Sequence, residues 1–567
     1  MRTNRIFVAM CIFLAVYVLL GGKIAYYQLW CGSELTQEAA AMRNKQIQLK
    51  EYSRGEILDR NLVSLTSTNS SNGLYCLIDN HYSESPEESI SELTDALARV
   101  FAEKDINTSQ WAAELMCAYQ MGKPYIRIAA DLTDEEILRI ESLQAPGLVV
   151  APVIKRYGSD GFCAHLLGYV SKSEIAQGQA GIEREYDEIL REGNAGQELV
   201  TVFDARGMAI SGLMFKVKED PKQKSNMVVL TIDKRVQEIV EKVMNEQVET
   251  GAVVVMDTKS REILAMASRP TFNPYQVENF LADKNRALSN RALNRYYPGS
   301  LFKIVVAAAA LEENLVSPSD HFFCNGQYIF NEDLAISCWN KEGHGEINFV
   351  QAFAQSCNPS FINLGIKLGR AKIMDYAAKL HVTDESLIGY SYNAKSHVSI
   401  NPGEPAIGNA CLGQQGVLIT PLQLASLIST VAEEGLFGPP RIIKYVVDET
   451  GQQEAPQMQE SQQVISRETA RVLKKLMTAA VTEGTGKTAR LQEVSVAGKT
   501  ATSQTEIFLD QDQELLNTWF GGFFPADNPR WAIVVLVENG KSGAASAAPV
   551  FKEIAREMLN LFPLTTN

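Results

Sequence analysis

The sequence has no block rich in arginine or lysine, and this absence limits the partners that it can bind. Its 567 residues carry a formal net charge of −14. Binding to nucleic acid needs a basic surface that neutralises phosphates, so we expect no nucleic-acid partner. Hydrophobic residues make up 46% and charged residues 21% of the chain, which is ordinary for a folded globular protein.

Cysteine and histidine show none of the local patterns that mark metal centres. The nine cysteines include no CxxC pair and the six histidines include no HExxH motif, so we expect no zinc cluster and no metal site. Cys324 and Cys338 are the only closely spaced pair beyond the N-terminal region. They are a candidate disulfide for a domain outside the cytoplasm, although spacing alone does not show that their geometry permits the bond.

Long hydrophobic runs are also absent, except for one at the N-terminus. Ile6 to Gly22 carries no charge, and its length is near the lower limit of about 17–25 residues for a membrane span. Arg2 and Arg5 precede it, so the positive-inside rule predicts a cytoplasmic tail (1–5) before the membrane anchor. The alternative is a cleaved signal peptide, but no A-x-A cleavage site follows the run. We therefore expect a single-pass anchor over residues 6–30, with the rest of the chain outside the cytoplasm.

The remaining chain is too long for a single hydrophobic core and suggests two to four domains. Lys216–Asn226 is charged, contains a proline and has few apolar residues, which is typical of a linker or exposed loop. We therefore expect an N-terminal domain over residues 31–226 and a second domain over residues 227–567. Short strands and helices in both regions indicate the α+β class.

Strand candidates lie at both ends of the second region. They are Met227–Ile232, Ala252–Asp257, Glu262–Ala267, Ser495–Thr502, Trp519–Phe524 and Trp531–Val537. A helix-rich block separates the two groups. The simplest packing is one antiparallel sheet built from both ends of the region and covered by helices. This arrangement would bring the strand at 495–502 close to residues near 300.

One candidate nucleophile lies at a predicted helix start. Pro298 and Gly299 interrupt what precedes, and an alanine-rich apolar stretch follows Ser300. Ser300 and Lys303 are three residues apart and would share a helix face. A lysine buried beside a serine loses its proton by desolvation and can act as its base. Alone this motif is weak, because a capping serine with a solvated lysine would look the same.

Two further motifs strengthen that hypothesis. Ser356-Cys357-Asn358 follows a helical stretch and precedes a proline, so its hydroxyl and carboxamide can point into one cleft from a turn. Lys499-Thr500-Ala501-Thr502 lies on a predicted strand, where alternation sends Lys499 and Ala501 to the same side. Chance occurrence of Ser-x-x-Lys, Ser-x-Asn and Lys-Thr in this order and in these settings is improbable.

The three motifs resemble the signature of penicillin-binding proteins and related β-lactamases. The chain resembles class B penicillin-binding proteins, the monofunctional cell-wall transpeptidases, over nearly its whole length. Further matching segments are Arg54–Asn61, His165–Val170, Gly181–Tyr186, Leu230–Asp233, Thr420–Gln423 and Trp519–Phe520. The family usually has glycine where this sequence has Leu62. The resemblance implies a transmembrane helix, an extended pedestal or dimerisation domain, and a penicillin-binding domain with a five-stranded antiparallel sheet flanked by helices.

The resemblance also implies roles for the first two motifs. Ser300 would attack the D-Ala-D-Ala carbonyl of a peptidoglycan stem peptide, and Lys303 would take its proton. Ser356 would relay protons toward the leaving amine, and Asn358 would hydrogen-bond the substrate amide. No cofactor is implied, and β-lactams would act as covalent inhibitors.

The third motif would bind the substrate and stabilise the transition state. Lys499 and Thr500 would hold the terminal carboxylate. The backbone N–H groups of Ser300 and Thr502 would form the oxyanion hole. Ala501 belongs to the same substrate-binding strand but departs from the family's Lys-Thr-Gly pattern. Its methyl group adds bulk where the strand approaches the nucleophile, which is expected to modulate or weaken activity.

Other functions fit the sequence less well than the transpeptidase. A β-lactam sensor needs a cytoplasmic output domain, whereas about five residues precede the predicted span. A catalytically inactive scaffold has Ala501 as its only support. Cys357 is a weak alternative nucleophile without an obvious base, and His344 is better explained as a turn residue. A bifunctional enzyme would carry a glycosyltransferase in the region that the pedestal motifs occupy here. The resemblance therefore implies a separate membrane glycosyltransferase and other wall-synthesis partners. It also implies a location in a bacterial cell membrane and a possible homodimer.

Overall fold

The computed structural model describes most of the chain as two compact units whose segments interleave in sequence. The residues it does not describe are 1, 37–45, 48–53, 67–68, 79–84, 103–107, 124, 144, 146, 173–175, 192–197, 201–215, 219–225, 385–386, 393–396, 449, 509–513 and 565–567. The smaller unit consists of Met1–Ser53, Asn69–Lys155 and Asn194–Gln223, and the larger unit of Arg54–Thr68, Arg156–Gly193 and Lys224–Asn567.

Two segments of the predicted 31–226 domain therefore belong to the larger unit. The first segment belongs there by strand pairing, because β2 (Glu56–Leu58) pairs in parallel with β8 (Met227–Leu230). The second is joined by hydrogen bonds such as that from the Cys163 N–H to Glu241 Oε1 at 2.7 Å. Part of the predicted linker, Lys216–Lys218, forms strand β7, and most of the rest lies outside the described residues. The position of the domain boundary remains a prediction.

The N-terminal apolar run forms one long helix, α1 (Arg2–Leu29). Its segment Ile6–Leu29 has 24 residues and a mean hydropathy of 2.3, which is long and apolar enough to cross a membrane. The predicted helix is thus confirmed, and it is the one such helix in the described part of the chain.

The smaller unit contains a three-stranded sheet with strands in the order β4-β3-β5 and a layer of helices. Its elements are β3 (Asn69–Leu77), β4 (Tyr125–Ala129), β5 (Leu148–Lys155), α3 (Pro86–Val100), α4 (Thr108–Gln120) and α5 (Asp134–Ser142). Buried apolar residues of the helices and the sheet form one core. A second small sheet joins β1 (Gln46–Ile47), β6 (Glu198–Val200) and β7.

The larger unit is built on a five-stranded antiparallel sheet in the order β10-β9-β23-β22-β21. Its strands are β9 (Gly251–Asp257), β10 (Ile263–Arg269), β21 (Ala497–Phe508), β22 (Glu514–Phe524) and β23 (Trp531–Glu538). This confirms a five-stranded antiparallel sheet built from both ends of the region, and the α+β class. The candidate strand Met227–Ile232 is the exception, because β8 pairs in a separate four-stranded sheet.

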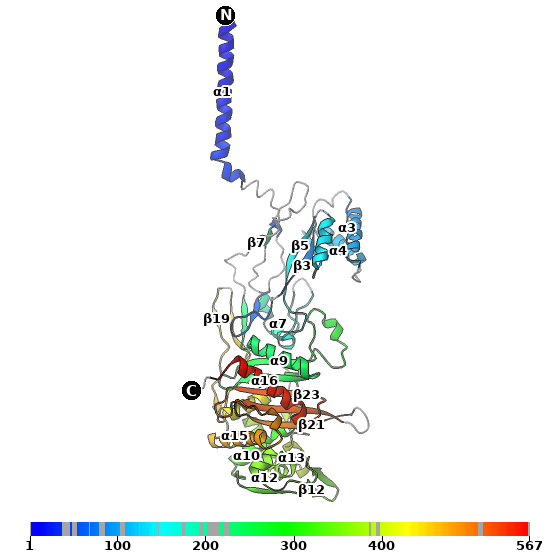
Figure 1. The fold of residues 1–567 in the computed structure, drawn as a ribbon, viewed down its shortest axis with the longest axis vertical. Helices are drawn as coiled ribbons and strands as arrows, with labels where there is room; N and C mark the ends of the chain where they lie inside the picture. Colours follow the sequence, from blue (N-terminus) through cyan, green and yellow to red (C-terminus); the bar gives the residue numbers. More distant parts are fainter. Residues whose placement is uncertain are drawn as a thin grey trace. The chain divides into compact units, whose positions relative to one another are not determined.

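Helices cover both faces of this sheet (Figure 1). On one face α9 (Lys234–Gln247) and α16 (Ala548–Leu561) bury their apolar sides against the strands. On the other face α10 (Lys303–Glu312), α14 (Pro421–Ala432) and α15 (Arg467–Thr482) pack in a second core. Helix α10 is alanine-rich and almost entirely buried, so it can lie in the middle of that core.

The other elements of the larger unit surround this framework. A four-stranded sheet has the order β19-β18-β8-β2, with β18 (Ile443–Val447) and β19 (Gln453–Glu454). The remaining strands are β11 (His321–Cys324), β12 (Gln327–Asn331), β13 (Leu334–Ser337), β14 (Gly345–Asn348), β15 (His397–Val398), β16 (Val417–Leu418), β17 (Leu436–Phe437) and β20 (Gln462–Gln463). The remaining helices are α6 (Ala164–Leu167), α7 (Gly181–Glu185), α8 (Asp187–Arg191), α11 (Phe349–Ala354), α12 (Asn358–Lys379) and α13 (Glu404–Cys411), with short turns η2 (Val277–Phe280), η3 (Arg291–Leu293), η4 (Gly299–Phe302), η5 (Lys487–Ala489) and η6 (Gly543–Ala547).

Two of the sequence motifs meet in a buried ion cluster. Glu183 is completely buried and forms ion pairs with Arg54 and Arg156. Arg54 also pairs with Asp187 through Nη1 and Oδ1 at 2.8 Å, and the Tyr157 hydroxyl donates to Glu183 at 2.8 Å. The Arg-Gly and Gly-Ile-Glu-Arg strings are thus explained by mutual charge compensation within the larger unit.

Candidate active site

The candidate nucleophile lies at the start of the buried helix α10. Ser300 is half-buried in the 3₁₀ turn η4, and the α-helix proper begins at Lys303. The predicted helix start near Ser300 is thus confirmed, with a tighter first turn. The Lys303 side chain is completely buried.

The Ser-x-Asn motif lies directly against this pair. The Ser356 hydroxyl donates to the Ser300 hydroxyl at 2.9 Å. Lys303 Nζ donates to the Ser356 carbonyl at 2.9 Å, to the Ser356 hydroxyl at 3.2 Å and to Asn358 Oδ1 at 2.8 Å. The hydrogen bonds therefore run from Lys303 through Ser356 to Ser300. Ser356 adopts the left-handed conformation with φ of 54°, a strain that often accompanies functional sites.

Two buried amines make the site electrostatically unusual. Burial lowers the pKa of Lys303 from its ordinary value to about 8. Lys499 is also completely buried, and burial together with the nearby Lys303 charge lowers its pKa well below the usual range. Each amine nitrogen lies near an aromatic ring centroid, that of Lys303 at 5.3 Å from Phe361 and that of Lys499 at 5.7 Å from Phe353. Such a site makes Lys303 easier to deprotonate and favours an anionic ligand beside Lys499.

The third motif lies on β21, an edge strand of the five-stranded sheet. A Cβ built on Gly299 would lie 2.9 Å from the Thr502 carbonyl oxygen and 3.3 Å from the Ala501 Cβ. The edge of β21 therefore runs directly beside the nucleophile turn. This confirms that the Ala501 methyl faces the element carrying Ser300.

Thr485 is a site residue that sequence reasoning missed. Its hydroxyl is 2.6 Å from the Thr500 hydroxyl, and its N–H donates to the Ala354 carbonyl at 3.1 Å. Thr485 follows α15 in a Gly-Thr-Gly string that carries no recognisable signal. It orients Thr500 and joins the third motif to α11.

Cys324 and Cys338, the candidate disulfide pair, are not bonded to each other in the structure. They belong instead to a larger group whose potential metal-binding atoms all lie within 4.8 Å of one another. The group, here called the Cys–His cluster, comprises Cys324, Cys338, His344 and Cys357. Its members are at least six positions apart in the sequence, so they form no CxxC pair.

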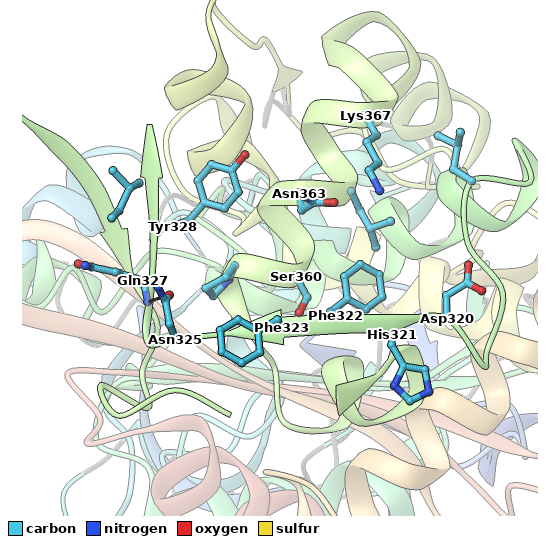
Figure 2. A pocket seen from close by; sticks show the side chains of 14 residues that line it. Asp320, His321, Phe322, Phe323, Asn325, Gln327, Tyr328, Ser360, Asn363 and Lys367 are labelled. Atoms are coloured by element: carbon cyan, nitrogen blue, oxygen red, sulfur yellow. Dashed lines mark hydrogen bonds between the residues drawn. The ribbon is translucent and has the colours of Figure 1, made fainter. Parts of the chain in front are cut away.

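A hollow of about 650 Å³ opens between β11, β12 and α12 (Figure 2). Asp320, His321, Asn363 and Lys367 are among its polar lining residues. Ser300, Lys303 and Lys499 do not line it. The hollow is therefore separate from the candidate active site.

Two regions of the chain match known protein families. Residues 251–556, more than half of the chain, match the model described as "Penicillin binding protein transpeptidase domain". Residues 50–230 match "Penicillin-binding Protein dimerisation domain".

Several characterised relatives are similar over most of their length. Stage V sporulation protein D of Bacillus subtilis is 29% identical, over 96% of this chain and 83% of the relative. Peptidoglycan D,D-transpeptidase MrdA of Haemophilus influenzae is 27% identical over 77% of this chain and 74% of the relative. Peptidoglycan D,D-transpeptidase FtsI of Escherichia coli K12 is 26% identical over 96% of this chain and 89% of the relative.

Proposed function

Since the chain belongs to the penicillin-binding protein transpeptidase family, class B, we propose that it cross-links peptidoglycan through an acyl-enzyme on Ser300. The observation that carries this proposal is the hydrogen-bonded series from Lys303 through Ser356 to Ser300. Two of the similar proteins are named peptidoglycan D,D-transpeptidases, which supports the same substrate for this chain.

Acylation begins when the Ser300 oxygen attacks the D-Ala-D-Ala carbonyl of a stem peptide. The Ser300 proton passes to neutral Lys303, directly or through the Ser356 hydroxyl, and then to the departing D-alanine amine. The C–N bond breaks as the ester to Ser300 forms. Because desolvation disfavours the charged form of Lys303, this lysine can accept a proton near neutral pH.

Substrate binding uses the edge of β21. Lys499 and Thr500 hold the terminal carboxylate, whose charge compensates the buried ammonium of Lys499. The N–H groups of Ser300 and Thr502 stabilise the oxyanion, a contribution of roughly 10²–10³ in rate per donor in other enzymes. Asn358 holds the substrate amide, and its own Nδ2 donates to the Ser337 carbonyl at 3.0 Å.

The second half-reaction joins two strands. An amine of a neighbouring stem peptide attacks the ester carbonyl, releases Ser300 and forms the new amide. A β-lactam enters the same site and leaves Ser300 acylated. Residues 31–226 as the pedestal or dimerisation domain, residues 227–567 as the catalytic domain, a homodimer, and a separate glycosyltransferase partner all belong to this proposal.

Labelling by fluorescent penicillin tests the nucleophile. The purified protein should be labelled covalently, and peptide mapping should find the adduct on Ser300. Ser300→Ala should abolish labelling without changing the melting temperature. Ser319→Ala, a matched change at an exposed serine, should leave labelling intact. Labelling that persists in Ser300→Ala, or that maps to Cys357, overturns the assignment, and an inert natural protein favours the scaffold.

Protease accessibility tests the topology. Arg2 and Arg5 precede the apolar helix, so the tail of residues 1–5 should be cytoplasmic and the catalytic domain outside the cell membrane. Protease added to intact protoplasts should therefore degrade the domain that carries Ser300. Complete protection of that domain would contradict this orientation.

A further inference from the structure

Two neighbouring contacts join the edge strand β21 to the segment that precedes the proposed nucleophile. Ala501 faces Gly299, where a built Cβ would lie 3.3 Å from the Ala501 Cβ. Two residues further along the strand, the Ser503 hydroxyl donates to the Tyr297 carbonyl at 2.7 Å. The numbering rises on one side and falls on the other, so segment 297–299 runs antiparallel to β21. A methyl contact at one end and a hydrogen bond at the other therefore connect the two.

The Ser503 side chain points into the protein. It is completely buried, whereas Thr502 is exposed. Alternation along a strand places Ala501 and Ser503 on one face and Thr502 on the other. A buried hydroxyl or carbonyl without a hydrogen-bond partner costs free energy. The bond between the Ser503 hydroxyl and the Tyr297 carbonyl is consequently favoured strongly over its loss.

The surroundings of the Ser503 hydroxyl favour Tyr297 as its acceptor. A hydroxyl has one proton to donate, and the Asn517 carbonyl, at 3.4 Å, is the more distant alternative. Trp519 Nε1 donates to the hydroxyl oxygen at 3.4 Å. Trp519 is completely buried and pairs with Ala501 in the β21–β22 ladder. The proton therefore serves the short bond to Tyr297, and the oxygen accepts from the neighbouring strand.

Backbone hydrogen bonds hold the same segment from its other side. Tyr296 exchanges two backbone hydrogen bonds of 3.0 Å with Ile419, and the Gly299 N–H donates to the Gly413 carbonyl at 3.0 Å. Between segment 297–299 and β21, the described residues form no backbone hydrogen bond. The Ser503 side chain supplies the direct polar link instead. Losing that link would open a gap at β21 without releasing the segment from the rest of the fold.

We propose that Ser503 is a positioning residue for acylation, an inference that rests on the proposed function. The Ala501 methyl keeps the nucleophile turn away from β21, whereas the Ser503 hydrogen bond draws the turn toward it. Thr502 lies between these two contacts, so together they set the distance from its backbone N–H to Ser300. Ser503 touches neither the substrate nor the reacting atoms. It acts through the spacing between the strand and the turn.

The opposing contacts predict that residues 501 and 503 are coupled. Without the Ser503 hydroxyl, the methyl contact alone determines the spacing, and β21 moves away from the nucleophile turn. With glycine at position 501, no methyl holds the strand away, so strand and turn can pack closely without the hydroxyl. A displacement of about 1 Å can reduce a reaction rate roughly 100-fold. The hydroxyl should therefore matter far more beside alanine than beside glycine.

The test is a double-mutant cycle of Ala501→Gly and Ser503→Ala in the full chain purified in detergent. Acylation by fluorescent penicillin at several concentrations gives the rate constant of the covalent step and the dissociation constant of the preceding complex separately. With Ala501 present, Ser503→Ala should slow the covalent step roughly tenfold or more and leave the dissociation constant almost unchanged. In the Ala501→Gly background, the same change should slow the covalent step only a few-fold.

Two further variants separate positioning from stability. Ser503→Cys keeps nearly the same volume but donates only weakly, so it should lose as much rate as Ser503→Ala, and it replaces that variant in the cycle if the alanine form does not fold. Ser268→Ala is the matched control. Ser268 is completely buried on the opposite edge strand, β10, and accepts a hydrogen bond from the Arg291 N–H at 3.0 Å. Its loss should lower the melting temperature but leave the acylation rate unchanged in both backgrounds.

Amide hydrogen exchange supplies a measurement that does not need catalysis. Peptides covering 297–303 and 499–505 should exchange faster in Ser503→Ala than in the natural protein, and adding Ala501→Gly should reverse the change. An equal loss of rate in both backgrounds, or unchanged exchange in Ser503→Ala, overturns the proposal. If penicillin does not label Ser300 at all, the proposed function fails, and hydrogen exchange still decides whether Ser503 sets the spacing.

Discussion

The Ala501 methyl faces Gly299, and a Cβ added at Gly299 would lie only 3.3 Å from it. Ala501 lies on the edge strand β21, and Gly299, with φ of 57°, immediately precedes the proposed nucleophile. The methyl group of residue 501 therefore lies against a backbone segment that has little room for a side chain.

The contact predicts how the size of residue 501 controls acylation. Ala501→Gly should be neutral or faster, since it removes one methyl from a tight contact. Ala501→Val should push β21 away from the nucleophile turn, and misplacing a reacting group by about 1 Å can cost roughly 100-fold in rate. The measurement is the second-order acylation rate by a reporter β-lactam, with melting temperatures in parallel. Equal rates for alanine, glycine and valine would contradict the contact.

Acylation should depend on pH through Lys303. Burial lowers its pKa to about 8, and the neutral amine is the form that accepts the Ser300 proton. The rate should therefore rise about tenfold per pH unit below that value and level off above it. Lys303→Arg keeps a permanent charge that cannot act as a base and should lose at least about 100-fold in rate. A flat profile between pH 6 and 9.5, or an active arginine variant, would show that Lys303 is not the base.

Leu62 should be a site of backbone strain. It has φ of 65°, and the left-handed conformation costs a non-glycine residue roughly 1–2 kcal/mol. Leu62→Gly relieves this strain but makes the unfolded chain more flexible, at about 0.5–1 kcal/mol. We expect a net gain of up to about 1 kcal/mol in the free energy of unfolding. Leu62→Ala keeps the strain and serves as the control, because Leu62 is largely exposed. Identical melting temperatures for Leu62→Gly and Leu62→Ala would exclude strain as the cause.

Glu183 should be essential for folding of the larger unit. It is completely buried between Arg54 and Arg156, and removing one partner of a buried ion pair typically costs about 3–5 kcal/mol. Glu183→Ala should therefore lower the melting temperature strongly. Glu185→Ala, two residues away at a more accessible position, should have little effect. Denaturant unfolding of both variants measures the difference, and comparable stability would show that the ion cluster is dispensable.

The sequence predicted the central framework of the larger unit because its signals are local. Most strands of the five-stranded sheet contain an apolar run bounded by turn residues, whereas β21 is largely polar and its edge position was not predicted. The motif residues Ser300, Lys303 and Ser356 were predicted together, and the structure brings them into hydrogen-bonding distance. Their catalytic roles remain predictions.

What the sequence could not predict depends on long-range contacts. Thr485 has no motif of its own and is recognised only by its hydroxyl beside Thr500. The Cys–His cluster joins residues up to 33 positions apart in the numbering, from Cys324 to Cys357, so their proximity is not evident from the sequence. The parallel pairing of β2 with β8 joins segments about 170 residues apart, which is why Arg54–Thr68 folds with the larger unit.

The strand order β10-β9-β23-β22-β21 has a consequence for biosynthesis. The middle strand, β23, is the last strand of the sheet to be made, and it separates β9 from β22. The hairpin β9–β10 is synthesised early. One apolar edge of it stays unpaired until more than two hundred further residues have been synthesised. The sheet cannot close before Trp531–Glu538 has arrived. A chain truncated in the helix-rich block would therefore keep an open, aggregation-prone strand edge.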